Sequence, residues 1–326
     1  MKRTIAIVAG GDSSEFPVSL RSAQGLYSFM DKEKYTVYIV EMKGLCWEAV
    51  LPDGNKTAVD RNDFSFLLNG EKITFDFAYI IIHGTPGENG LLQGYFDLLH
   101  IPYSTCDVLA SALTFNKFAL NHYLQGFGIR ISDSLLVRKG SDICDQDVIE
   151  KIGLPCFIKP NEGGSSFGVT KVKTAEQIRP AIEKAMHESD EVMVEAFMAG
   201  TEITCGCYKT RTKEVVFPIT EVVSKNEFFD YAAKYDGESQ EITPARLDDD
   251  TTRRVKTLTS AIYDILGCEG IIRVDYIITE GGKINLLEVN TTPGMTATSF
   301  IPQQVRAAGL DMKDVLTDII ENKFIS

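Results

Sequence analysis

The chain has 326 residues, of which 44% are hydrophobic and 24% are charged, and its formal net charge at pH 7 is −13. This length exceeds the usual size of one domain, so we expect two or three subdomains. The acidic balance argues against binding to nucleic acid or to an anionic membrane surface, because both need a basic face on the protein. An anionic small ligand would require Lys and Arg side chains that gather locally.

Cysteine usage and hydropathy indicate the compartment. The seven cysteines are scattered, with no CxxC motif and no histidine at metal-ligand spacing, so neither a zinc site nor a disulfide framework is expected. Free thiols are typical of the reducing cytosol. No apolar run in the sequence reaches the ~18 residues of a membrane span. We therefore expect a soluble cytoplasmic protein.

The first strand is predicted at residues 5–9, an apolar run that Gly10-Gly11 closes. Such a run is typical of a strand buried on both faces of an α/β sheet. A helical pattern starts at residue 16, and Glu15 lies between the two elements, at the sheet edge where ligands bind. An acid that only stabilises the helix N-terminus would be the simpler interpretation of Glu15 by itself.

Another strand is predicted at residues 78–82 and ends at His83, beside the glycine-rich loop 84–90. A solvated or capping histidine is the simple interpretation, but a position at a strand end beside a loop favours a function. Residues 107–125 are predicted to form one helix. This helix carries Lys117, which could be an ordinary surface lysine.

A short strand at residues 156–160 places Lys159 directly before residues 161–168, which are rich in Gly and Ser. Such a turn exposes backbone N–H groups to an anion, and the lysine adds positive charge. The loop is not a Walker A motif, because GxxxxGK[ST] is absent and residues 169–172 predict a returning strand. A hairpin loop that folds over phosphates and a flexible turn without function fit this pattern about equally well.

Strands are also predicted at residues 192–198, 201–208 and 214–219. Residues 224–245 show no convincing periodicity, and a polar loop of this length inside a compact domain is usually a lid or another functional loop. Within it, Lys234 and Tyr235 set a cation beside an aromatic hydroxyl. A helix over residues 248–266 is predicted to follow.

A β-hairpin is predicted near the C-terminus. Gly281-Gly282 lies between two runs of alternating apolar residues, and both glycines can take positive φ in a two-residue turn. That register places three pairs of side chains opposite each other on one face: Asp275 and Glu288, Arg273 and Asn290, and Ile277 and Leu286. The other face would then carry Val274, Tyr276, Leu287 and Val289.

The facing acids of this hairpin indicate a cation. Two carboxylates opposite each other destabilise a sheet unless a positive charge lies between them. Carboxylate and amide oxygens suit Mg²⁺ or Mn²⁺, so the candidate ligands are Asp275, Glu288 and Asn290. The alternative is a solvated sheet face on which Arg273 neutralises one acid.

Together these motifs resemble an ATP-grasp enzyme and, within that superfamily, the D-alanine–D-alanine ligase family. The resemblance covers nearly the whole chain through six motifs in the family's order: Gly10-Gly11 with Ser14-Glu15 and Val18-Ser19, His83-Gly84 with 87–90 and Gln93-Gly94, Lys159-Pro160 with 164–166 and Gly168-Val169, 231–235, Arg273 with Asp275, and 288–295. It implies an α/β ATP-grasp fold. An N-terminal Rossmann-like parallel-sheet domain (1–104) would precede two α+β subdomains that clasp ATP (105–197 and 198–326).

The resemblance also implies roles for individual positions. The phosphates of ATP would be held by Lys117 and Lys159. Adenine and ribose would contact Glu195, Phe197, Met198 and Glu202. Two Mg²⁺ or Mn²⁺ ions would be bound by Asp275, Glu288 and Asn290. The D-alanine substrates would contact Glu15, His83, Lys234 and Ser299. The lid would close through Ser165 and Tyr235. The acyl phosphate and the tetrahedral intermediate would be stabilised by Arg273 and the backbone of Gly294.

The implied activity is an ADP-forming ligation of two D-alanines for peptidoglycan precursor synthesis, by a cytoplasmic homodimer. Related D-alanyl–D-lactate ligases carry a histidine in the lid segment, whereas this chain has Lys234-Tyr235 like the dipeptide-forming members. Asn116 and Ala196 depart from the family pattern, which bears on nucleotide affinity. The alternatives are a D-alanyl–D-lactate or D-alanyl–D-serine ligase, or a non-catalytic ATP-binding protein on the same fold.

Overall fold

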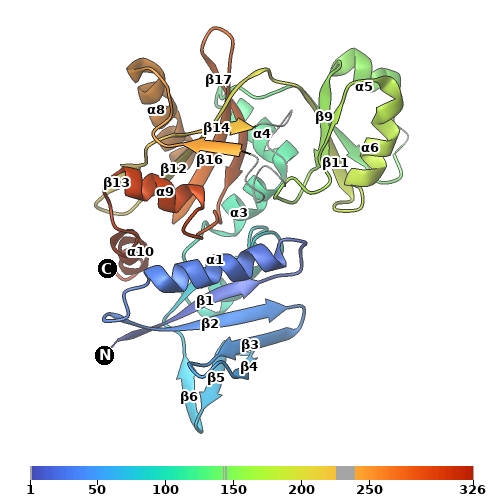
Figure 1. Ribbon diagram of the computed structural model, residues 1–326. Coiled ribbons are helices and arrows are strands. Elements are labelled where there is room, and N and C mark those ends of the chain that lie inside the picture. Colours follow the sequence, from blue (N-terminus) through green and yellow to red (C-terminus); the bar gives the residue numbers. More distant parts are fainter. Residues whose placement is uncertain (1, 142, 144, 225–238, 326) are drawn as a thin grey trace.

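The computed structural model describes residues 2–141, 143, 145–224 and 239–325, and three sheets form its framework (Figure 1). The first sheet has the strand order β6-β5-β4-β3-β2-β1-β7, formed by β1 (Arg3–Gly10), β2 (Tyr35–Lys43), β3 (Cys46–Val50), β4 (Lys56–Asp60), β5 (Ser65–Leu68), β6 (Glu71–Thr74) and β7 (Phe77–Ile80). Helices α1 (Phe16–Phe29) and α2 (Leu91–Leu99) belong to the same part of the chain.

The parallel part of this sheet agrees with the sequence pattern. β1 pairs in parallel with β2 and β7, and side chains 5–9 of β1 are completely buried. The sheet then continues from β2 to β6 as antiparallel neighbours, an extension that the sequence analysis does not predict. The carboxyl ends of β1 and β7 lead directly to the loops that carry Glu15 and His83.

The second sheet has the order β10-β9-β11-β8 and is antiparallel throughout. Its strands and helices are β8 (Ser134–Arg138), α5 (Asp145–Lys151), β9 (Cys156–Pro160), β10 (Thr170–Val172), the 3₁₀ helix η1 (Ala175–Gln177), α6 (Ile178–Ala185) and β11 (Glu191–Ala196). The Gly/Ser loop connects β9 to β10, so the predicted returning strand is confirmed.

The third sheet has the order β15-β14-β12-β16-β17, with β13 also paired to β12. Its elements are β12 (Gly200–Lys209), β13 (Glu214–Val216), β14 (Thr220–Ser224), β15 (Ser239–Ile242), α8 (Asp249–Ile265), β16 (Ile271–Thr279), β17 (Lys283–Asn290), α9 (Phe300–Ala307) and α10 (Met312–Asn322). Strand β15 corrects the prediction of a continuous loop from 224 to 245. Four residues are too few for a period to show in the sequence, and the strand forms because β14 offers its free edge.

The predicted two-residue hairpin turn is wrong, but the predicted pairs of Asp275 with Glu288 and of Arg273 with Asn290 are present. Thr279 pairs with Lys283, so the turn contains three residues, and a bulge between Asp275 and Tyr276 shifts the register. The two irregularities cancel, and Asp275 still faces Glu288. Beyond the bulge Tyr276 pairs with Leu286, which is completely buried, and Leu287 lines a cavity on the other face. The predicted pairing of Ile277 with Leu286 and the predicted face of Leu287 are therefore wrong.

The helix predicted at residues 107–125 is broken into α3 (Val108–Phe115) and α4 (Lys117–Gln125). Asn116 interrupts it with φ −86° and ψ 98°, and its side-chain oxygen accepts a hydrogen bond from Ala119 N at 3.0 Å. Asn is a preferred N-cap residue, which explains why α4 starts there. The break places Lys117 at the first position of α4.

The sheets share hydrophobic cores across the predicted domain boundaries. Buried residues of α3 and α4 pack in one core with β12, β16 and β17, whereas residues of α1, β1 and β7 share another core with α9 and α10. Figure 1 shows α1 lying between the first sheet and the C-terminal helices. The boundaries at 104 and 197 stay a prediction. In the described part of the chain, every helix is too short or too polar to cross a membrane.

Gly25 of α1 is expected to be needed for the close packing of α1 against the segment that follows β17. A Cβ atom at Gly25 would lie 2.3 Å from the carbonyl oxygen of Met295, so the Gly25→Ala change must displace backbone. We expect a loss of about 1–3 kcal/mol in the free energy of unfolding, measured by urea denaturation. The control is Gly94→Ala in α2, whose Cβ would meet only Val108 at 3.7 Å. It should be neutral or add up to about 1 kcal/mol, since Ala favours helix. Equal free energies of unfolding for the two variants would contradict the requirement for glycine at position 25.

Candidate active site

Two adjoining cavities lie where the three sheets meet. The larger, of about 600 Å³, is bordered by the start of α1, the loop after β7, the end of β17 and the start of α9. The smaller, of about 250 Å³, lies between the second and third sheets. Both are lined by Lys117, 163–165, Arg273, Glu288 and Phe300. A ligand in one cavity can therefore reach a ligand in the other across this shared wall.

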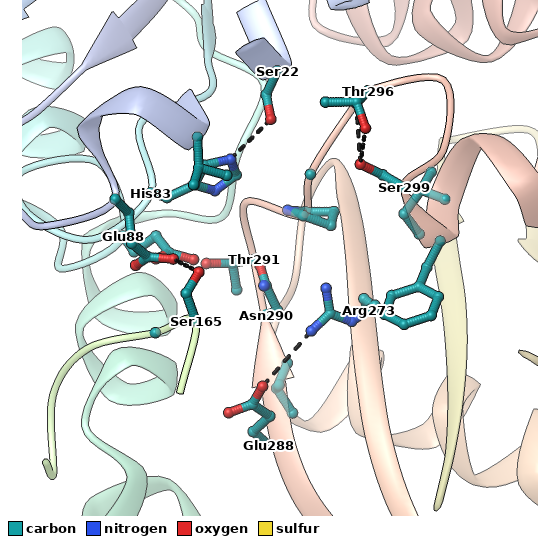
Figure 2. A pocket seen from close by; sticks show the side chains of 18 of the residues that line it. Ser22, His83, Glu88, Ser165, Arg273, Glu288, Asn290, Thr291, Thr296 and Ser299 are labelled. Carbon is teal, nitrogen blue, oxygen red and sulfur yellow. Dashed lines mark hydrogen bonds and ion pairs between the residues drawn. The ribbon is translucent and has the colours of Figure 1, made fainter. Parts of the chain in front are cut away.

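The larger cavity brings together most of the predicted amino-acid-binding residues. Glu15 is 6% exposed and His83 is 5% exposed, and both line it. In Figure 2, His83 and Glu88 lie opposite Thr296 and Ser299, with Arg273 and Glu288 below. The Oγ of Ser22 lies 3.1 Å from His83 Nε2, and burial lowers the pKa of His83. Burial therefore favours the neutral imidazole, because a buried cation loses its hydration.

The far side of this cavity is built by the segment that follows β17. The Oγ of Ser299 accepts a hydrogen bond from Thr296 N at 3.1 Å and lies 2.8 Å from Thr296 Oγ1. A Cβ atom at Gly294 would lie 3.0 Å from Ser299 Oγ, so the two predicted residues are neighbours. A hydroxyl and a backbone segment are thus available to a substrate carboxylate.

The Gly/Ser loop folds over both cavities, and its hydroxyl reaches Glu15. Ser165 donates a hydrogen bond from Oγ to Glu15 Oε1. Ser165 and Ser166 have φ of 49° and 60°, a region that costs energy for residues other than glycine. Strained backbone of this kind is common at ligand-binding loops. The strained backbone and the contact with Glu15 favour the interpretation of this segment as a ligand-binding loop over that of a simple connecting turn.

Gly164 is expected to be required for activity while contributing little to stability. A Cβ atom there would lie 2.6 Å from Glu15 Oε2, the mobile end of a side chain. We expect the Gly164→Ala change to displace the carboxylate and raise KM for the predicted amino-acid substrate at least about tenfold, since one lost charged contact is worth roughly 1.5–3 kcal/mol. Thermal unfolding should stay near the wild-type midpoint. Steady-state kinetics with Gly94→Ala as the control tests this, and an unchanged KM would contradict it.

Lys117 and Lys159 converge on the shared wall and the smaller cavity. Lys117 donates from Nζ to the carbonyl of Gly163, and the pKa of Lys117 is lowered first by burial and also by the charge of Lys159. The interpretation of Lys117 as an ordinary surface lysine is wrong, because it lines both cavities. Two cations held near each other are stabilised by an anion between them.

The wall of the smaller cavity carries the residues predicted to contact adenine and ribose. Lys159 Nζ lies 2.7 Å from Glu195 Oε2, and Glu195 Oε1 has no hydrogen-bond partner among the described residues. Glu202, Met198 and Phe197 also line the cavity. The predicted strand 192–198 ends earlier, at Ala196, because the chain leaves the second sheet there for the third.

The hairpin acids face the shared wall. Arg273 contacts Asp275 through two hydrogen bonds of 2.9 and 2.7 Å and lies 3.7 Å from Glu288. Asp275 also accepts a hydrogen bond from Thr204 Oγ1, and Asn290 Oδ1 accepts one from Thr292 N at 3.0 Å. Arg273 therefore neutralises one acid, as in the alternative considered from the sequence. Among the described residues no group of three or more His, Cys, Asp or Glu could hold a metal ion.

Two predicted site residues are not described by the structure, and two acids that line the larger cavity were not predicted from the sequence. Lys234 and Tyr235 fall outside the described residues. Two carboxylates that line the larger cavity, Glu88 and Glu241, have no predicted role. Burial raises the pKa of Glu241, and burial together with the charge of Glu15 raises the pKa of Glu88 to about 8. The available signal for Glu88 was its place in a glycine-rich loop after a strand.

Comparison with known proteins identifies the family. The sequence model described as D-ala D-ala ligase N-terminus matches residues 4–106, and the one described as D-ala D-ala ligase C-terminus matches residues 123–321. The chain belongs to the D-alanine–D-alanine ligase family. Membership confirms the predicted ATP-grasp fold and the resemblance seen in the motifs.

Relatives within the D-alanine–D-alanine ligase family match along their full length. The D-alanine–D-alanine ligase of Phocaeicola vulgatus is 80% identical over 324 residues, which cover 99% of this chain and 100% of the relative. That of Parabacteroides distasonis is 62% identical over 323 residues, with 99% and 98% covered.

Solved structures of related ligases share the fold. The VanG D-Ala:D-Ser ligase from Enterococcus faecalis has a TM-score of 0.86 at 30% identity, with 99% of each chain covered. The D-alanine–D-alanine ligase from Bacillus anthracis complexed with ATP has a TM-score of 0.78 at 28% identity, with 99% and 97% covered. The family therefore includes members described with different second substrates.

Proposed function

We propose that this protein is an ADP-forming ligase that joins two D-alanines through D-alanyl phosphate, for peptidoglycan precursor synthesis. The observation that supports this function most is the wall shared by the two cavities. One cavity is lined by groups suited to a nucleotide and the other by groups suited to amino acids. Arg273 and Glu288 lie on both, where the transferred phosphoryl group would meet the first D-alanine.

The chemistry takes two steps. A carboxylate is a poor electrophile, so an oxygen of the first D-alanine attacks the γ-phosphorus of ATP, the bond to ADP breaks, and D-alanyl phosphate forms. The neutral amine of the second D-alanine then attacks the carbonyl carbon, and phosphate leaves as the dipeptide forms. The charges that develop in both steps need donors already held in position.

The residues of this chain supply those donors. Lys117 and Lys159 would hold phosphates, and Glu15 would hold the ammonium of the first D-alanine. Arg273 and the backbone of Gly294 would stabilise the oxygen of the tetrahedral intermediate. Ser299 would bind the carboxylate of the second D-alanine. Enclosure between the Gly/Ser loop and the sheets would exclude water, which would otherwise hydrolyse the acyl phosphate.

The donor set on β16 and β17 fits Mg²⁺ or Mn²⁺. Asp275 and Glu288 face each other in the paired strands, and Asn290 lies two residues further along the same strand. Mg²⁺ is usually bound by one or two carboxylates, with water and phosphate oxygens completing its coordination. When bound, two such ions would neutralise phosphate charge. Arg273 occupies these carboxylates in the structure, so its guanidinium would share them with the metal.

The activity is tested by phosphate release from the purified protein with ATP, Mg²⁺ and D-alanine. We expect turnover with D-alanine as the second substrate to exceed turnover with D-serine or D-lactate at neutral pH. Turnover with another acid but none with D-alanine would overturn the substrate. ATP binding without any turnover, together with biological activity that survives Asp275→Ala and Glu288→Ala, would favour a non-catalytic protein. A cytoplasmic homodimer is part of the same proposal, and sedimentation velocity tests the dimer.

A further inference from the structure

Glu88 is a carboxylate of the larger cavity to which the proposed mechanism gives no task. It lies in the loop between β7 and α2 and faces the cavity beside His83 (Figure 2). The backbone N–H of Gly84 donates to Glu88 Oε2 at 2.6 Å. Its position is therefore set by the same strand-end loop that positions His83.

The loop also brings Glu88 close to Glu15. A Cβ atom at Gly84 would lie 3.7 Å from Glu15 Oε2, so Gly84 holds one carboxylate and borders the other. Glu15 belongs to the segment before α1, and the Ser165 hydroxyl binds its Oε1. Two carboxylates of different segments thus converge at one end of the cavity.

Among the described residues, which do not include the lid segment 225–238, the charges around this pair do not neutralise it. The charged groups that act on Glu88 are Glu15 before α1, Lys117 at the start of α4 and Glu288 on β17. Two of these are acids, and the Nζ of Lys117 is bound to the carbonyl of Gly163. Burial and the charge of Glu15 accordingly raise the pKa of Glu88 to about 8. Without a ligand, a proton on Glu88 relieves the repulsion at neutral pH.

We propose that Glu88 is a second carboxylate of the ammonium subsite and, together with Glu15, holds the amino group of the first D-alanine. This inference rests on the proposed function. An ammonium group carries three N–H donors, of which Glu15 would take one and Glu88 another. When the substrate binds, the O–H bond of Glu88 breaks, its proton passes to solvent, and the substrate cation takes its place.

Two consequences follow for recognition. The first site favours a substrate with an ammonium group, since a substrate without it offers no N–H donors to the two carboxylates and no cation to replace the proton on Glu88. The affinity for D-alanine rises with pH up to about 8, because below that pH each binding event must remove a proton from Glu88. This rise ends when the amino group of free alanine itself loses its proton.

The test measures protons as well as activity. D-alanine is titrated calorimetrically into the full chain with Mg²⁺ and a non-hydrolysable ATP analogue at pH 7, in buffers of different ionisation enthalpy. We expect the wild type to release about one proton, as a carboxyl with a pKa near 8 should. Glu88→Gln should release none, and its KM for D-alanine should rise at least tenfold while KM for ATP changes less than twofold.

Two variants separate this role from a structural one. Glu88→Asp should keep the proton release at weaker affinity. Glu241→Gln removes another buried acid of the same cavity, one that Gln303 binds, and should leave the proton release unchanged. Proton release from Glu88→Gln equal to the wild type, or an unchanged KM for D-alanine, would overturn the inference. Absence of wild-type turnover with D-alanine would instead contradict the proposed function, so the two failures are distinguishable.

Discussion

Arg273→Ala is expected to lower kcat/KM for D-alanine about 10³-fold. The guanidinium lies on the wall shared by both cavities, is 12% exposed, and contacts the facing acids Asp275 and Glu288. Removing one preorganised donor for a developing oxyanion costs about 10²–10³-fold in rate. The loss in kcat/KM should lie at the upper end of this range, because the same change leaves two carboxylates facing each other without a fixed cation.

Two controls accompany Arg273→Ala in the same phosphate-release assay. Arg273→Lys keeps the charge but loses the planar pair of hydrogen bonds to Asp275, so most of the activity should still be lost. Arg246→Ala removes another arginine that pairs with an acid, Glu221, but its side chain is 64% exposed and lies outside both cavities. The kcat/KM of Arg246→Ala for D-alanine should stay within threefold of the wild-type value. A loss below tenfold for Arg273→Ala would refute the role given to this residue.

Lys159→Met is expected to reduce both stability and ATP binding. The side chains of Lys159 and Glu195 are 10% and 2% exposed and lie 2.7 Å apart. Removing one partner of a buried ion pair typically costs about 3–5 kcal/mol, because the other charge stays buried and unpaired. Loss of the lysine also removes a charge from the proposed phosphate site. Urea denaturation and calorimetric titration with ATP measure the two effects separately.

A double variant distinguishes the two effects. Lys159→Met with Glu195→Leu replaces the pair by apolar side chains, which often restores stability, but it should not restore ATP binding. The control Lys139→Met breaks the pair with Asp190, whose side chains are 67% and 77% exposed, and should cost less than about 1 kcal/mol. Wild-type stability of Lys159→Met, or normal ATP binding by the double variant, would contradict the assignment.

The sequence pattern predicted the β-hairpin and the helical segment 107–125, but it missed the turn length of the first and the break in the second. The pair Asp275 and Glu288 was placed by a two-residue turn that the structure lacks, and a compensating bulge restores the register. Asn116 ends one helix and caps the next, a signal that the sequence carried and the apolar periodicity concealed. In both cases the hydrogen bonds of a few backbone groups decided the outcome, and a hydropathy pattern does not record them.

The order of the motifs, the family that they indicate and many of the strands and helices can be predicted from the sequence, because these depend on residues near each other in the chain. The packing of distant segments places Lys117 on both cavities, brings Ser165 to Glu15 and brings Glu88 close to the same carboxylate. Glu15 and Glu88 belong to loops after different strands. Their meeting depends on the parallel packing of β1 beside β7, which brings both strand ends to one edge of the sheet.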